Sequence, residues 1–239
     1  MKLKLCSSIL SLSAGLALAL VPAYSTTITT YSDPVSWAAA TTPGYQTVTF
    51  TGLAPSGGST NYSSATGVTN LGVEFIGYNS AGTSVIQVVD SSAFSWYNDG
   101  TGDALLESAS PEPSSSSPLP YINIVLPANI TALGMDLWTT STPAMSYSIV
   151  VAGNTYTVPT VGSNTETFWG ITSDTAVSSL QLTVPAATSS SSTEALLDNF
   201  SFGASDMSAA PEAGTYLLIG TGLISLIVLR KRLMPEKRL

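Results

Sequence analysis

Apolar and polar side chains alternate with a period of two along most of the chain between residues 24 and 210. This period is typical of β-strands that bury one face, whereas the pattern of an amphipathic helix repeats about every 3.6 residues. Clusters of Gly, Asn, Pro and Ser separate the alternating runs, as at 54–60, 98–102 and 153–154, and indicate turns. We expect seven or more short strands, with these residues facing a core: Val48, Phe50, Leu71, Val73, Phe75, Ile122, Ile124, Leu126, Leu133, Met135, Leu137, Tyr147, Ile149, Val151, Tyr156, Val158, Leu180, Leu182 and Val184.

The pattern predicts an all-β domain over residues 24–204, built as an antiparallel, jelly-roll-like sandwich. One short helix is expected near its start, because Ser32 or Asp33 can cap a helix and Pro34 suits the first helical position. Trp37 would lie in this helix and cover one end of the sandwich.

Charge is distributed very unevenly along the chain. All seven Lys and Arg residues lie near the ends, nothing from Leu5 to Leu229 is basic, and there is no histidine. Two of the fifteen acidic residues, Glu212 and Glu236, lie beyond residue 210, so the body carries thirteen carboxylates. Affinity for nucleic acid comes mainly from Lys and Arg on phosphates, so the composition excludes nucleic acid as a partner.

The first 23 residues have the layout of a secretory signal peptide. Lys2 and Lys4 precede an apolar run from Ile9 to Val21, and small residues suit cleavage after Ala23. The one cysteine, Cys6, precedes this site, so we expect a mature chain without a disulfide.

The other end predicts a single transmembrane helix. Residues 213–229 are uncharged and 17 residues long, near the lower limit for crossing a membrane, and a basic cluster follows at 230–232. Basic residues stay on the cytoplasmic side, so the body would lie outside, after a linker at 205–210 and with a cytoplasmic tail at 234–239. A buried C-terminal core helix is the alternative.

Three features of this end occur together. Pro211, Glu212 and Ala213 precede an apolar helix with paired glycines, and Arg230, Lys231 and Arg232 follow it. The segment 211–233 resembles the PEP-CTERM sorting signal of Gram-negative bacteria, with Ala213 in place of the usual second proline. The resemblance implies processing near Pro-Glu by an exosortase, an integral-membrane protease. It also implies export through an inner-membrane intermediate, with the body on the periplasmic side, to the cell surface or the extracellular space.

A second resemblance covers parts of the body. The segments 30–33, 48–52, 168–172 and 197–200 are similar to recurring elements of β-rich modules carried by other proteins with this sorting tail. In those modules an acidic residue often stands where this chain has Thr51. The resemblance implies a fold but no activity.

The residue types restrict the chemistry of the body. Without His, Lys or Arg, catalytic triads, imidazole metal ligands, Schiff bases and arginine clamps are excluded. Carboxylates remain, and they can ligate calcium or, in pairs, cleave glycosides. Asp99, Asp103 and Glu107 around a glycine-rich turn form one candidate cation site, and a solvated polar turn is the alternative.

Asp198 is the candidate calcium ligand. In a regular strand it shares parity with Leu196, Phe200 and Phe202 and would point into the core, where a carboxylate without a partner is costly. No basic side chain of the body could pair with it, so its partners would be polar groups, water or a cation. The alternative is a β-bulge that turns Asp198 outward.

Aromatic residues could stack on sugar rings or fill the core. The candidates for a sugar-stacking platform are Tyr31, Tyr62, Tyr78, Trp96, Tyr97, Trp138 and Trp169. We expect an exported, non-enzymatic protein of the cell surface or extracellular matrix, with polysaccharide as the candidate ligand. The alternative is an extracellular carbohydrate-active enzyme that uses two carboxylates, for which Glu74, Glu166 and Glu194 are the candidates.

Overall fold

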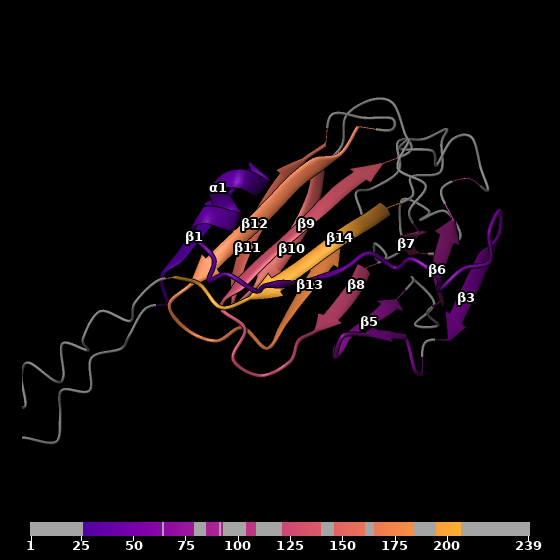
Figure 1. The fold of residues 1–239 in the computed structure, drawn as a ribbon, viewed down its shortest axis with the longest axis horizontal. Coiled ribbons are helices and arrows are strands. Elements are labelled where there is room, and N and C mark those ends of the chain that lie inside the picture. Colours follow the sequence, from indigo (N-terminus) through magenta and orange to yellow (C-terminus); the bar gives the residue numbers. More distant parts are fainter. Residues whose placement is uncertain are drawn as a thin grey trace, which may run out of the picture. The chain divides into compact units, whose positions relative to one another are not determined.

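Two antiparallel β-sheets form most of the regular structure in a computed structural model of the chain (Figure 1). The structure describes residues 26–63, 65–78, 85–90, 92, 104–108, 121–139, 146–160, 165–183 and 195–206. They belong to one compact unit, Thr26–Ser208. The predicted signal peptide and sorting segment lie outside the described residues. Within the described residues, no helix is long and apolar enough to span a membrane.

The larger sheet has eight strands, in the order β1-β12-β9-β14-β7-β6-β3, with β2 paired to β14. Its strands are β1 (Ile28–Tyr31), β2 (Gln46–Val48), β3 (Ser59–Ser63), β6 (Val85–Asp90), β7 (Ala104–Ser108), β9 (Ala132–Thr139), β12 (Thr167–Ser173) and β14 (Ala195–Gly203). The smaller sheet has six strands, in the order β11-β10-β13-β8-β5-β4. These are β4 (Val68–Asn70), β5 (Val73–Tyr78), β8 (Tyr121–Val125), β10 (Ser146–Val151), β11 (Asn154–Pro159) and β13 (Ser179–Thr183).

The inner faces of both sheets share one hydrophobic core. Phe75 of β5 meets Phe200 of β14 edge to face, with ring centroids 5.4 Å apart, and Tyr156 of β11 packs against Trp169 of β12 at 5.8 Å. Each pair joins the small sheet to the large one. The all-β class with antiparallel sheets is therefore confirmed, whereas the jelly-roll-like path of the chain stays a prediction.

Most of the predicted inward-facing residues lie in this core, and Leu71 is the clear exception. Leu71 is 50% exposed, because Leu71 and Gly72 form the reversal between β4 and β5, with φ of 51° and 81°. The pairing of Asn70 with Val73 leaves these two residues to turn the chain, so the prediction that Leu71 faces the core is wrong. Val184 lies outside the described residues.

The predicted short helix is present as α1 (Pro34–Ala39). The Asp33 carboxylate caps it by accepting from the Ser36 N–H at 2.8 Å. The hydrogen bond from the Ser36 hydroxyl, together with this backbone bond, lowers the pKa of Asp33. Trp37 does not cover an end of the sandwich as expected. It lies on the outer face of the large sheet, where Gly134 of β9 and Gly170 of β12 leave room for its ring.

Two residues assigned to the predicted linker at 205–210 are bonded to the body. Ser205 forms an isolated bridge with Thr41, and the Asp206 N–H donates to the Ala40 carbonyl at 3.1 Å. The last strand, β14, is thus followed by a short segment fixed next to α1.

Candidate ligand-binding face

The outer face of the six-stranded sheet carries a row of side chains in register. Ile76, Asn123, Gln181, Val150 and Thr155 are neighbours across five strands, from β5 to β11. Successive side chains of a strand point to opposite faces, and the next residues along these strands are core residues. The row therefore points away from the core.

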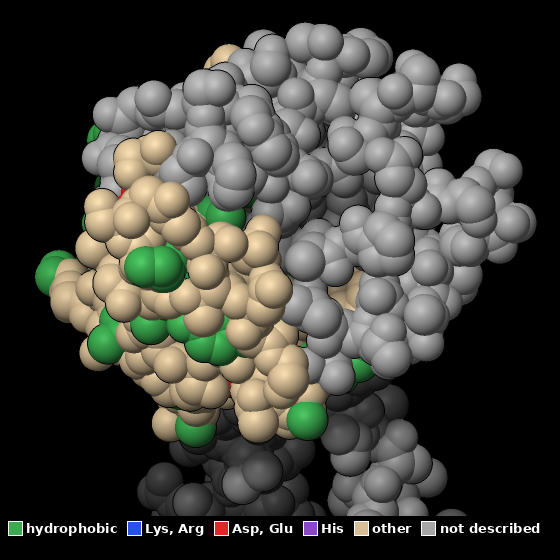
Figure 2. Space-filling view, turned by 90° about the vertical axis from the view of Figure 1, so that its right-hand side faces the viewer, with side chains coloured by type: hydrophobic (Ala, Val, Ile, Leu, Met, Phe, Trp, Pro, Cys, Tyr) green, Lys and Arg blue, Asp and Glu red, His purple; other side chains and the backbone are tan. Residues whose placement is uncertain are grey.

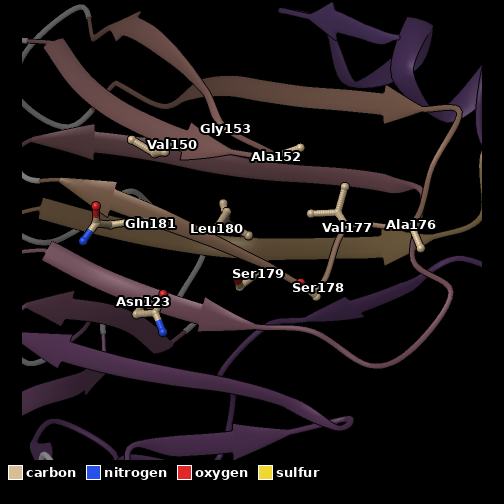
Figure 3. A pocket seen from close by; sticks show the side chains of 10 residues that line it. All are labelled: Asn123, Val150, Ala152, Gly153, Ala176, Val177, Ser178, Ser179, Leu180 and Gln181. Atoms are coloured by element: carbon tan, nitrogen blue, oxygen red, sulfur yellow. The ribbon is translucent and has the colours of Figure 1, made fainter. Parts of the chain in front are cut away.

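A pocket of about 330 Å³ lies on this face (Figure 3), near the lower end of the range of small-molecule sites, roughly 300–1,000 Å³. Strands β8, β13 and β10, the β10–β11 turn and the segment before β13 form it. The lining residues are Asn123, Val150, Ala152, Gly153, Ala176, Val177, Ser178, Ser179, Leu180 and Gln181, none of them charged.

A tight turn builds one wall of the pocket. Val151 pairs with Asn154, so Ala152 and Gly153 alone reverse the chain, with φ of 47° and 77°. Two residues with positive φ are the pattern of a type I′ hairpin turn, whose twist matches that of the flanking strands. The predicted turn at 153–154 is thereby displaced by one residue.

Two amides lie in the pocket. Asn123 and Gln181 are directly opposite each other on β8 and β13, and both are half-buried. Neither side chain has a hydrogen-bond partner among the residues that the structure describes. Each amide can therefore offer two N–H donors and a carbonyl acceptor to a ligand.

A stacked pair of tyrosines stands two residues along the same face. Tyr78 of β5 is opposite Tyr121 of β8, and their rings are 4.8 Å apart at an interplanar angle of 20°. Both side chains are half-buried. The stacked rings therefore lie on the same outer face as Asn123 and Gln181.

The predicted aromatic platform does not form as one surface. Trp138 and Trp169 are buried, and the Tyr62 hydroxyl donates to the Leu53 carbonyl at 2.9 Å while its ring packs against the core. Tyr31 lies on β1 at the edge of the large sheet. Of the predicted set, Tyr78 alone lies on the outer face of the small sheet within the described residues; Trp96 and Tyr97 lie outside them.

Sequence reasoning missed Tyr121, Asn123 and Gln181 as site residues. Strand parity could have placed all three on an outer face, since their neighbours Ile122, Ile124, Leu180 and Leu182 were predicted to face inward. Strand parity does not give the register between strands. The register brings Tyr78, Tyr121, Asn123 and Gln181, which are far apart in the sequence, together on one surface.

Asp198 lies on the outer face of the large sheet. The register with β9 shifts between Asp198 and Ser201, and Asn199 has a φ of 47°, so a β-bulge interrupts the strand. Leu197, not Leu196, therefore shares the core with Phe200. The alternative of a β-bulge that turns Asp198 away from the core is confirmed. Asp198 is fully buried although it lies on the outer face of the sheet.

A second carboxylate stands opposite Asp198. Asp136 of β9 is its partner in register, and the Asn199 amide Nδ2 donates to Asp136 Oδ2 at 2.9 Å. Burial raises the pKa of Asp136, against the lowering effect of the Asn199 hydrogen bond.

The raised pKa of Asp136 gives a pH-dependent prediction. The folded chain holds the proton of the Asp136 carboxyl group more tightly than the unfolded chain does. Protonated Asp136 therefore contributes fully to stability below about pH 4, and this contribution is lost as the pH rises through the folded-state pKa. Asp136→Asn removes the titration and keeps an oxygen that can accept from Asn199. Urea unfolding of the full chain gives the free energy of unfolding of each protein. The difference between the wild type and Asp136→Asn should fall from about pH 4 to about pH 7. A difference that does not change with pH would contradict the raised pKa of Asp136.

Calcium at Asp198 stays a prediction. Calcium takes roughly six to eight oxygen ligands. No group of three or more His, Cys, Asp or Glu that could hold a metal occurs in the described part of the chain. Asp99 and Asp103 lie outside the described residues, and Glu107 lies on β7, opposite Leu196.

The candidate catalytic glutamates are not brought together. Glu74 lies on β5 of the small sheet, and Glu166 directly precedes β12 of the large sheet. Glu194 lies outside the described residues. Paired carboxylates of a glycosidase flank one bond, whereas Glu74 lies in one sheet and Glu166 next to a strand of the other.

Comparison with known proteins gives weak likenesses. No family model matches the chain, and no curated protein matches it in sequence. Among solved structures, a mutant of the carbohydrate-binding module CBM29-2 complexed with mannohexaose aligns with 64% of this chain and 99% of its own, at 12% identity and a TM-score of 0.35. The Agl-KA catalytic domain aligns with 65% of this chain and 29% of its own, at 14% identity and a TM-score of 0.32. These identities and TM-scores are too low to show a shared family or fold.

Proposed function

We propose that this chain is an exported protein of the cell surface or extracellular matrix whose β-sandwich binds polysaccharide on the outer face of its six-stranded sheet. The observation that carries the proposal is the uncharged pocket in which Asn123 and Gln181 lie beside the stacked pair Tyr78 and Tyr121. Amides pair with sugar hydroxyls, and aromatic rings pack against the apolar faces of sugars. Rigid strands hold both kinds of group on one surface.

A glycan array probed with the full chain in detergent tests this function. We expect a defined set of glycans to bind, and we expect Tyr121→Ala to weaken that binding by about tenfold or more, since an aromatic contact contributes roughly 0.5–1.5 kcal/mol beyond area burial. Asn123→Ala should weaken it by several-fold (about fivefold), through a lost hydrogen bond.

Two matched variants on the large sheet serve as controls. Tyr31→Ala on β1 and Asn61→Ala on β3 remove side chains of the same two types, but from the large sheet and not from the candidate face of the small sheet. Asn61 is exposed. They should leave binding unchanged. Equal effects of site and control variants, or binding to no glycan, would refute the proposal, and release of sugar from bound glycans would favour the enzymatic alternative.

The proposal includes processing at the C-terminus. The resemblance of residues 211–233 to a PEP-CTERM signal supports recognition by an exosortase-type membrane protease through Pro211, Glu212 and Ala213, with Arg230, Lys231 and Arg232 as the cytoplasmic stop. The apolar run and the basic cluster support an inner-membrane intermediate with the body on the periplasmic side.

Mass spectrometry of the protein from fractionated cells tests the processing. We expect a mature N-terminus after Ala23 and, in the surface fraction, a C-terminus close to Pro211 and Glu212. Glu212→Ala should trap the intermediate in the inner membrane, whereas Glu236→Ala in the tail should not. Surface-located protein that still ends at Leu239 would exclude cleavage.

A further inference from the structure

We infer that the ligand of this face is a neutral, hydroxyl-rich glycan, bound as a chain that crosses strands β8, β13 and β10, and that anionic polysaccharides are rejected. The inference rests on the proposed function and names the substrate class of the same site. It follows from the charge of the face, from the donors and acceptors it offers, and from its dimensions.

The face offers no cation. Glu74 is the one charged residue on the six strands of the small sheet, and no residue from Leu5 to Leu229 is basic. Figure 2, a view of one side of the molecule, accordingly shows no blue or purple side chain among the described residues. An anionic glycan would lose hydration without gaining an ionic partner and would enter the field of an acidic domain.

The polar groups match hydroxyls better than carboxylates. Asn123 and Gln181 each present both donors and an acceptor, and exposed Ser179 adds a hydroxyl that can do either. A sugar hydroxyl also donates and accepts, so it can satisfy both halves of an amide. A carboxylate or sulfate only accepts, and would leave the amide carbonyls facing negative charge.

The dimensions require more than one sugar. Asn123, Gln181 and Val150 lie on three neighbouring strands, which spans about 10 Å at the usual strand spacing, and Tyr121 stands about 7 Å from Asn123 along β8. A ligand that contacts both the tyrosine pair and the turn at Gly153 must therefore be an oligosaccharide. Affinity should rise from monosaccharide to oligosaccharide and then level off.

The experiment compares neutral glycans with uronic-acid-containing and sulfated glycans on one array, at low and at high salt. The full chain should bind neutral members, and their binding should change less than about twofold with salt, because screening acts on charges. A single Gln181→Lys substitution places a cation in the pocket. It should create salt-sensitive binding to anionic members, whereas Asn61→Lys on β3 should not.

The outcomes separate the two proposals. Binding restricted to anionic glycans, or wild-type binding that is abolished by salt, overturns this inference and leaves polysaccharide binding by the face intact. Equal binding of a monosaccharide and its oligomers overturns the chain-crossing mode. Binding to no glycan at all overturns the proposed function together with the inference. Far-UV circular dichroism on each variant confirms that the fold is kept.

Discussion

Replacing Trp37 with alanine should lower the free energy of unfolding by about 3–5 kcal/mol, the usual cost of truncating a buried tryptophan. The side chain is 2% exposed, and its Nε1–H donates to the Ile171 carbonyl at 3.1 Å. It also packs against Tyr45 and Phe168, with ring centroids 5.0 Å and 6.0 Å away. The variant loses these contacts and this hydrogen bond, and it leaves a cavity over β9 and β12.

Urea unfolding of the full chain, followed by far-UV circular dichroism, measures the loss. Val35→Ala is the control on the same helix, because Val35 is 75% exposed, and it should change stability by less than about 0.5 kcal/mol. If both variants unfolded at the same urea concentration, α1 would contribute nothing to the stability of the sheet beneath it.

The second large effect is expected at Tyr147, whose hydroxyl joins the two sheets. Tyr147 stands on β10 of the small sheet and is fully buried. Its hydroxyl donates to the Trp138 carbonyl of β9 and accepts from the Leu196 N–H of β14 at 3.1 Å. Burial also raises the pKa of this phenol far above its usual range, so it stays protonated.

Tyr147→Phe keeps the ring but leaves a buried N–H and a buried carbonyl without that partner. Each buried group left unsatisfied costs about 1–3 kcal/mol, so we expect a loss of stability in that range or somewhat above. Tyr156→Phe on the neighbouring strand is the matched control, since no hydrogen bond of its hydroxyl occurs within the described residues. Equal unfolding midpoints for the two variants would contradict the bridging role.

The strands were predictable from local pattern, because a period of two follows directly from which face is buried. The order of the strands was not. β9 pairs with β12 and β14, and β8 with β5 and β13, and such long-range pairing depends on how whole faces fit together. For the same reason Asn123 could be assigned to an outer face, but its neighbour Gln181, 58 positions further along, could not.

The bulge at Asn199 shows a second limit. Parity counted through residue 199 places Asp198 on the same face as Phe200, and one residue with a φ of 47° reverses that relation. Asn adopts this conformation more readily than most residues, so Asn199 was a usable signal. A bulge is decided by the pairing of both strands, however, and a single strand's sequence leaves both outcomes open.

The turn at Ala152 and Gly153 bears on how tightly the pocket can hold a ligand. A two-residue reversal between paired strands leaves its wall little freedom, and the amides stand on strands that are paired on both sides. A protein surface that is already ordered loses little conformational entropy when a flexible glycan settles on it. Most of the entropic cost of association would then come from ordering the sugar chain. Stiff or naturally extended polysaccharides lose less conformational entropy on binding, so they should be the preferred ligands.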